Sequence, residues 1–107
     1  MKLFRQSDSG DRGWFVGKFD RAVLNTDLCE VAYQINFKGE KHPAHIHKIA
    51  TEVNLIVSGH TIMSGHHLRA GDGIIFYPGD VCECEYLEDT ASVVVKVPGP
   101  LNDKYLV

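Results

Sequence analysis

The sequence predicts an all-β protein made of antiparallel strands. Three observations support this fold class: about eight short apolar or alternating segments, turn signals roughly every 6–12 residues, and no stretch with a convincing helical period. The chain has 107 residues and contains no internal repeat, linker or low-complexity segment. We therefore expect one domain covering residues 1–107.

The first expected strands follow a polar beginning. Residues 1–13 contain a Ser-Asp-Ser-Gly-Asp interruption, and we expect a flexible arm there. Residues 14–19 form an aromatic run of strand length. Residues 28–37 alternate clearly, so we expect a half-buried strand with one apolar and one polar face. The apolar face, expected to be buried, holds Val31, Tyr33, Ile35 and Phe37, and the polar face holds Glu30, Gln34 and Asn36.

The remaining strands are separated by turns rich in glycine, proline, serine and aspartate. After the segment 39–59, expected strands end at Met63 and cover 66–69, 74–77, 81–87 and 92–97. The last is rich in β-branched residues and is stopped by Pro98-Gly99-Pro100. The tail from 101 to 107 is short and partly apolar.

Composition excludes several classes of function. The net charge is −3 with a pI near 6.0, and no cluster of Lys or Arg is present, which argues against a nucleic-acid surface. No apolar run approaches the roughly 20 residues of a membrane span. The first residues lack the apolar core of a signal peptide, so we expect a cytoplasmic protein. The odd number of cysteines, three, then predicts reduced thiols.

Three residues have the types and spacing of metal ligands. His45 and His47 are two apart, so on a strand both side chains point to one face. Glu52 follows a short polar turn, and we expect it on the returning antiparallel strand as a third ligand. Two imidazoles and one carboxylate with open coordination positions suit a first-row divalent metal and Lewis-acid or oxygen chemistry.

The segment 39–59 also resembles the first sequence motif of the cupin superfamily. Gly39, His45, His47, Glu52 and Gly59 reproduce the pattern G-x5-H-x-H-x4-E-x6-G without a gap. The resemblance implies an antiparallel jelly-roll β-barrel with a divalent metal ion, and leaves open whether the metal is iron, manganese, zinc, nickel or copper. It also implies a homodimer, which the shortness of the chain supports.

The second cupin motif is incomplete in residues 71–87. Gly71-Asp72 and Pro78 occupy recognisable places, but no histidine follows to act as the fourth ligand. Counting from Pro78 gives Glu83 in that position, whereas a turn one residue shorter gives Cys82. The other parity of this strand would bury two carboxylates, so we expect Cys82 to face the site. A set of three ligands remains the alternative.

Other residues receive weaker assignments. His42 has the wrong parity for the face of His45, and we expect it in a loop, as a possible substrate contact. His60, His66 and His67 flank turns and should be solvated. We expect five large apolar and aromatic side chains mainly in the core: Tyr33, Phe37, Ile56, Phe76 and Tyr86. All of them except Phe37 are also candidates for lining the pocket and binding substrate.

Two functions from different classes follow. The first is a metalloenzyme that acts on an oxygen-rich small molecule by dioxygenase or isomerase chemistry, with His45, His47, Glu52 and Cys82 as ligands. The alternative is a small-molecule or sugar-binding cupin without turnover, linked to sugar-nucleotide metabolism. The incomplete second motif favours the alternative, and the ending Asn102-Asp103-Lys104-Tyr105 resembles small cupins of surface-sugar pathways.

Overall fold

The computed structural model describes residues 1–99 and 103–107. Pro100 and Asn102, which the sequence analysis assigned to the strand stop and to the sugar-linked ending, lie outside the described residues. The described part contains no α-helix. Its elements are a 3₁₀ turn, η1 (Gln6–Asp8), and the strands β1 (Trp14–Val16), β2 (Glu30–Asn36), β3 (Lys41–His47), β4 (Thr51–Ser58), β5 (His60–Met63), β6 (His66–Arg69), β7 (Gly73–Phe76), β8 (Cys82–Tyr86), β9 (Thr90–Val97) and β10 (Lys104–Leu106).

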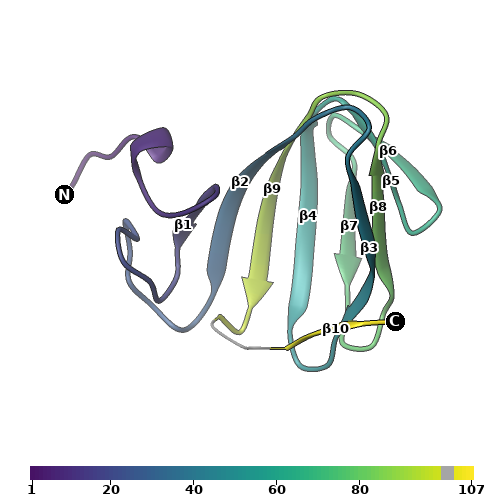
Figure 1. Cartoon of the computed structure of the whole chain (residues 1–107). Coiled ribbons are helices and arrows are strands. Elements are labelled where there is room, and N and C mark those ends of the chain that lie inside the picture. The colour runs from purple at the N-terminus through teal and green to yellow at the C-terminus, as the bar shows by residue number, and fades with distance from the viewer. Residues whose placement is uncertain (100–102) are drawn as a thin grey trace.

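The strands form two antiparallel sheets (Figure 1). Sheet A has the order β1-β2-β9-β4-β7, and sheet B has the order β10-β3-β8-β5-β6. The predicted all-β, antiparallel class is confirmed. Closure into a barrel stays a prediction, because the described strands pair within two separate sheets. Strand β10 was missed in the sequence analysis.

The polar face of β2 points inward, contrary to the prediction from its alternation. Ala32 is buried and Asn36 is 8% exposed, whereas Tyr33, Ile35 and Phe37 are 36%, 50% and 59% exposed. Strand β4 has the same arrangement, with Asn54 buried and Leu55 exposed. The assignment of Tyr33 and Phe37 to the core was therefore wrong. Sheet A encloses polar side chains and presents apolar ones to the outside.

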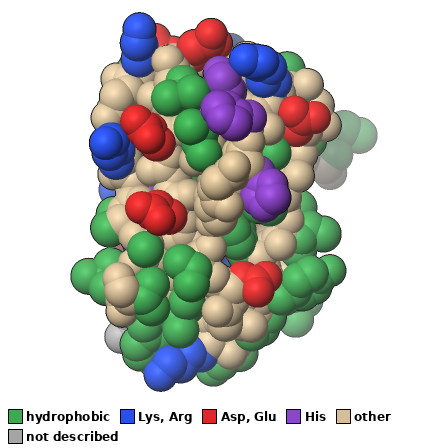
Figure 2. Space-filling view, turned by 90° about the vertical axis from the view of Figure 1, so that its right-hand side faces the viewer, with side chains coloured by type: hydrophobic (Ala, Val, Ile, Leu, Met, Phe, Trp, Pro, Cys, Tyr) green, Lys and Arg blue, Asp and Glu red, His purple; other side chains and the backbone are tan. Residues whose placement is uncertain are grey.

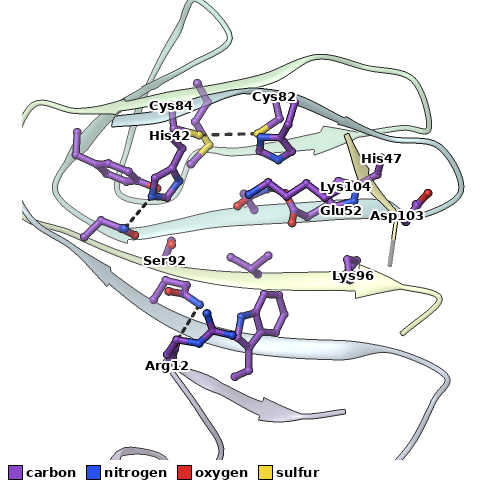
Figure 3. A pocket seen from close by; sticks show the side chains of 18 residues that line it. Arg12, His42, His47, Glu52, Cys82, Cys84, Ser92, Lys96, Asp103 and Lys104 are labelled. Atoms are coloured by element: carbon purple, nitrogen blue, oxygen red, sulfur yellow. Dashed lines mark hydrogen bonds between the residues drawn. The ribbon is translucent and has the colours of Figure 1, made fainter. Parts of the chain in front are cut away.

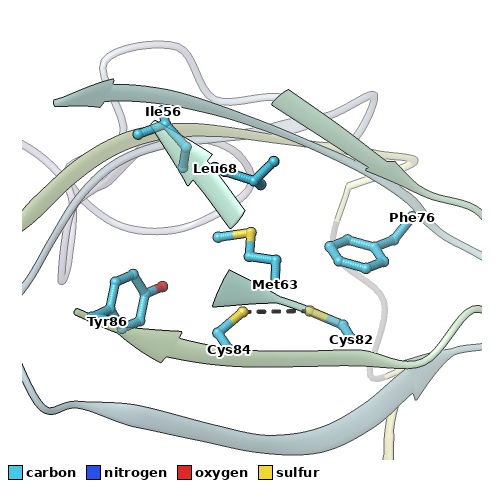
Figure 4. Packing of buried hydrophobic residues seen from close by; sticks show 7 residues of the cluster. All are labelled: Ile56, Met63, Leu68, Phe76, Cys82, Cys84 and Tyr86. Atoms are coloured by element: carbon cyan, nitrogen blue, oxygen red, sulfur yellow. Dashed lines mark hydrogen bonds between the residues drawn. The ribbon is translucent and has the colours of Figure 1, made fainter. Parts of the chain in front are cut away.

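A dry core fills one part of the space between the sheets (Figure 4). It contains seven buried side chains from both sheets: Ile56, Met63, Leu68, Phe76, Cys82, Cys84 and Tyr86. Ile56 and Met63 are at most 2% exposed. Burying a large apolar side chain contributes about 1.5–3 kcal/mol, so this cluster is the main apolar support of the sandwich. Ala32, Ala91 and Val94 are buried outside it.

The two glycines that bound the segment 39–59 are required for different reasons. Both have a positive φ, 92° at Gly39 and 97° at Gly59. This backbone conformation is unfavourable for residues that carry a Cβ atom. A Cβ atom at Gly59 would lie 2.4 Å from the carbonyl oxygen of Asp89 and 2.7 Å from Cα of Thr90. At Gly39 it would meet nothing within 4 Å.

Replacing these glycines should separate conformational strain from steric conflict. Gly39→Ala should lower the free energy of unfolding by about 1 kcal/mol, because only the backbone conformation is disfavoured. Gly59→Ala should lower it by more than about 2 kcal/mol, because the backbone of β9 must also move. Urea unfolding of the two variants measures both values. Equal losses in the two variants would show that the close approach at Gly59 is unimportant.

Candidate functional site

A polar cavity of about 460 Å³ lies between the two sheets (Figure 3). Side chains from both sheets line it, including the three predicted metal ligands, His45, His47 and Glu52. His45 and His47 lie on β3 in sheet B, and Glu52 lies on β4 in sheet A. The predicted antiparallel pairing of the two motif strands was therefore wrong, because the turn between them leads from one sheet to the other. The imidazoles and the carboxylate enter the cavity from opposing sheets.

His45 is oriented by a backbone carbonyl group. Its Nδ1 atom lies 3.0 Å from the carbonyl oxygen of Pro43. A carbonyl oxygen only accepts, so Nδ1 must carry a proton, and in the neutral ring Nε2 then keeps its lone pair. His45 is 7% exposed. This arrangement, in which one ring nitrogen is held by the protein and the other is free, is typical of histidines that bind metals.

His47 has a buried nitrogen atom with no partner. Its ring centroid is 5.4 Å from that of His45, and the ring planes are nearly perpendicular. The Nδ1 atom of His47 is buried and makes no hydrogen bond within the described residues. Burial lowers the pKa of His47, although the nearby carboxylate of Glu52 acts in the opposite direction. A neutral imidazole with an unsatisfied buried nitrogen is able to accept either a proton donor or a metal ion.

Glu52 is held among polar neighbours on sheet A. The Nδ2 atom of Asn54 donates to its Oε2 atom over 3.3 Å. Lys96 is opposite both Glu52 and Glu30 in the sheet, and its Nζ atom is 2.7 Å from Oε1 of Glu30. The charge of Lys96 is therefore balanced mainly by Glu30. This leaves the carboxylate of Glu52 available to a ligand in the cavity.

A β-bulge brings His42 to the same cavity, which contradicts its assignment to a loop. The register of β3 against β8 shifts between His42 and His45. An extra residue in the strand reverses the parity, so two side chains three positions apart share the inner face. His42 lines the cavity and packs edge-on against Tyr86, with ring centroids 5.4 Å apart.

Strand β8 has the predicted parity. Cys82, Cys84 and Tyr86 are buried, Glu83 is exposed, and Glu85 is intermediate. Both cysteines line the cavity, with Cys82 opposite His45 and Cys84 opposite His42. All three cysteines are free thiols. Of the two residues considered for the fourth ligand position, only Cys82 points into the cavity.

The two buried thiols and His42 influence one another. The Sγ atoms of Cys82 and Cys84 are 3.9 Å apart. Hydrogen bonds from Cys82 and then from His42 lower the pKa of Cys84, against the effect of burial. The same contact with Cys84, together with burial, raises the pKa of Cys82. His42 has a raised pKa, chiefly because of its hydrogen bond with Cys84.

Of the four predicted substrate contacts, only Tyr86 lines the cavity. Tyr86 lines the cavity, and burial raises the pKa of its phenol, which stays protonated. Ile56 and Phe76 are buried in the apolar cluster but do not line this cavity. Tyr33 lies on the outer face of sheet A and also does not line it. His66 and His67 are exposed on the hairpin β5–β6, as expected, whereas His60 is half-buried with its Nε2 atom 2.9 Å from Nδ1 of His67. None of the three lines the cavity.

Several cavity residues were missed in the sequence analysis. Arg12, Lys96 and Lys104 bring cationic groups to its lining. Asn36, Asn54 and Ser92 line it from sheet A, and their regular alternation with apolar residues was the available signal. Lys104 comes from β10, where it is opposite His47. No local pattern connects it with the histidines, because the contact depends on the return of the chain end to β3.

The three predicted ligands have the donor types that suit a divalent metal ion. The free Nε2 of His45, the unpartnered Nδ1 of His47 and the carboxylate of Glu52 line one cavity. Within residues 1–99 and 103–107, no three His, Cys, Asp or Glu side chains lie close enough together to hold an ion as they stand. Metal binding would therefore require rotation of these side chains towards one another.

Comparison with solved structures identifies the fold. A protein with a double-stranded β-helix domain from Klebsiella pneumoniae is 23% identical, with a TM-score of 0.72, and the match covers 99% of this chain and 91% of that one. The chain has the cupin fold. No protein-family model matches the sequence, and no curated protein matches it significantly.

Two further cupin-fold neighbours are larger proteins. The DMSP lyase DddQ from Ruegeria pomeroyi is 20% identical, with a TM-score of 0.67 over 98% of this chain and 59% of that one. The bacterial pirin YhhW from Escherichia coli, solved in complex with nickel(II), is 15% identical, with a TM-score of 0.69 over 82% of this chain and 39% of that one. At these identities the likeness establishes the cupin fold and no activity.

A search of the described residues finds no helix with the length and hydropathy of a membrane span.

Asp103 stabilises the turn that carries the chain from the histidines to Glu52. It is 3% exposed, and its carboxylate accepts hydrogen bonds from the backbone N–H groups of Lys48, Ile49 and Ala50. Burial acts to raise the pKa of Asp103, but these three bonds together lower it below its ordinary value of 3.8. The folded state therefore favours the ionised carboxylate.

Asp103→Asn should lower the stability of the fold at neutral pH. It should also make that stability less sensitive to a fall in pH. A depressed pKa in the folded state gives stability that is complete above the unfolded pKa and is lost as the pH falls through the folded pKa. The variant should thus melt below the parent at pH 7, and the two melting temperatures should begin to converge only below about pH 4, as the pH falls through the lowered pKa of Asp103 in the folded state. Thermal unfolding across this range measures the effect, with the exposed Asp20→Asn as control. A constant difference at every pH would contradict it.

Proposed function

We propose that this cupin-fold protein binds a divalent first-row metal ion through His45, His47 and Glu52. The unpartnered, buried Nδ1 atom of His47, beside an oriented His45, is the observation that carries the proposal. Cys82, opposite His45, is the candidate for the fourth position. The nickel(II) complex of pirin, a neighbour with the same fold, supports the binding of a divalent ion by this fold.

The substrate that suits the cavity is an oxygen-rich, anionic small molecule. A bound divalent ion supplies Lewis-acid character to a coordinated oxygen atom. Lys104 lines the cavity with a cationic group that attracts a carboxylate, whereas Arg12 is paired with Asp11 and Lys96 with Glu30. The protonated phenol of Tyr86 offers a neutral hydrogen-bond donor. With a metal ion bound, this donor set would supply Lewis-acid chemistry of the dioxygenase or isomerase type.

Metal analysis of protein purified without a histidine tag tests the proposal. The parent should contain close to one equivalent of metal. His45→Ala, His47→Ala and Glu52→Gln should each lower the affinity by more than about tenfold, because each removes a ligand. His66→Ala, which changes an exposed histidine outside the cavity, should retain the metal. Folded parent protein that takes up no divalent metal would refute the proposal.

A binding module without turnover is the second candidate function. It is favoured by the observation that no three His, Cys, Asp or Glu side chains in the described ranges are positioned to hold an ion. Sugars, nucleotide sugars, keto acids and catechols cover the classes of ligand to be compared. In a thermal-shift panel, stabilisation by one class both with and without a chelator would favour the module. Stabilisation that requires the metal would favour the enzyme.

The outer face of sheet A supports a homodimer. Val31, Val95, Val53 and Ile75 are paired in one row across four strands, and Tyr33, Val93 and Leu55 form the next row. The larger of these side chains are 36–46% exposed. Figure 2 shows, in contrast, charged and histidine side chains scattered over the outer face of sheet B. An apolar face of this kind is typical of a surface that is covered by another protein, and a second copy has the same apolar character.

Charge placed on this face should dissociate the dimer. Leu55→Lys should give a monomer, because a stable interface of about 800 Å² per partner tolerates no unpaired charge at its centre. Val81→Lys is the matched control, since Val81 is 47% exposed, like Leu55 at 45%, but precedes β8 in sheet B. Sedimentation velocity at micromolar concentration measures both. A monomeric parent would contradict the homodimer.

The cytoplasmic location and the lack of nucleic-acid and membrane partners stay predictions.

A further inference from the structure

A row of soft donor atoms crosses three neighbouring strands of sheet B. Cys84 on β8 is directly opposite His42 on β3 and directly opposite Met63 on β5. Cys82 lies two residues from Cys84 on the same face, with its Sγ atom 3.9 Å from that of Cys84. Three sulfur atoms and one imidazole therefore share one region of the inner face.

All four side chains border the cavity described above. Met63, Cys82 and Cys84 are 2%, 5% and 5% exposed, and each lines the cavity together with His42. Figure 4 shows Met63 extending from β5 into the space above the two cysteine sulfur atoms, while Figure 3 shows His42 beside Cys84. The sulfur atoms therefore lie where the polar cavity meets the dry core.

The separation of the two thiols suits a shared ion. Two sulfur ligands about 2.3 Å from one metal, at tetrahedral or trigonal angles, lie about 3.8–4.0 Å from each other. The observed 3.9 Å is within that range. The two thiols therefore need little rearrangement to bind one ion. No three His, Cys, Asp or Glu side chains of residues 1–99 and 103–107 are close enough to hold an ion as they stand, so His42 must rotate towards the thiols to complete the site.

We propose that Cys82, Cys84, Met63 and His42 form a binding site for monovalent copper. Thiolate and thioether sulfur atoms select Cu(I), and a thioether in particular is a poor ligand for harder divalent ions. The apolar residues around the sulfurs, among them Ile56 and Leu68, exclude water and favour the reduced ion. Packing accounts for a buried methionine or cysteine taken singly, and Asn36 and Tyr86 hold the ring of His42. The observation that carries the proposal is that two thiols, a thioether and an imidazole lie together on one face.

This site is separate from the proposed divalent site except at Cys82. Glu52, on the opposite sheet, belongs to the divalent set, and its carboxylate suits harder ions than Cu(I). Cys82 is opposite His45 and adjacent to Cys84, so the two ions would compete for its sulfur. Substitution of Glu52 should therefore weaken only divalent binding, and substitution of Cys84 only Cu(I) binding.

Titration of reduced, metal-free protein with Cu(I) under anaerobic conditions tests the proposal. The free copper is set by a chromogenic Cu(I) chelator, and the ultraviolet thiolate-to-copper charge-transfer band reports sulfur ligation. The parent should bind one equivalent. Cys84→Ser should weaken binding more than about 100-fold, and Met63→Leu, which conserves apolar volume, about tenfold. Cys29→Ser, a half-buried thiol outside the cavity, and Glu52→Gln should bind as the parent does.

Each outcome of the titration either supports or overturns the proposal. Equal affinities for the parent, Cys84→Ser and Met63→Leu would overturn the proposal, as would a parent that binds no Cu(I). A loss with Glu52→Gln equal to that with Cys84→Ser would place the ion in the divalent site and also overturn it. If circular dichroism shows that Cys84→Ser does not fold, Met63→Leu decides. Failure of the divalent site alone would leave Cu(I) binding intact and abolish divalent binding in the parent.

Discussion

The two sheets enclose polar groups, and each of these groups needs a partner once it is removed from water. Asn54 donates to Glu52, Asn36 donates to Glu40, and Lys96 pairs with Glu30. Asp103 accepts three backbone N–H groups at the turn after the histidines. These bonds hold the cavity open and polar while the apolar cluster at Met63 and Phe76 supports it from one side. The unpartnered nitrogen of His47 is conspicuous against this background.

The sequence predicted the parts of the site that depend on local spacing. His45 and His47 share a face because they are two apart on a strand, and the alternation from Cys82 to Tyr86 gave the correct parity of β8. The parity of β2 was predicted incorrectly. Alternation shows that a strand has an apolar and a polar face, but not which face is enclosed. When the interior is a wet cavity, the apolar face can lie outside, as it does at Tyr33 and Ile35.

The remaining errors come from irregular or distant structure. His42 was assigned to a loop because parity counting assumes a regular strand, and a bulge between His42 and His45 breaks that assumption. Lys104 and Asp103 contribute to the cavity from a chain end that is more than fifty residues from the histidines, as the sequence separation of the Asp103 hydrogen bonds shows. The crossing of the motif from β3 in one sheet to β4 in the other also has no local signature.

Strand β10 occupies the edge of sheet B, where Lys104, Tyr105 and Leu106 pair with residues 47, 46 and 45 of β3. This short strand covers backbone groups that β3 would otherwise leave unpaired beside both histidines. The same hydrogen bonds would form with the terminal strand of a second molecule. Exchange of these strands would link two molecules through their tails and bring the lysine of each molecule to the cavity of the other.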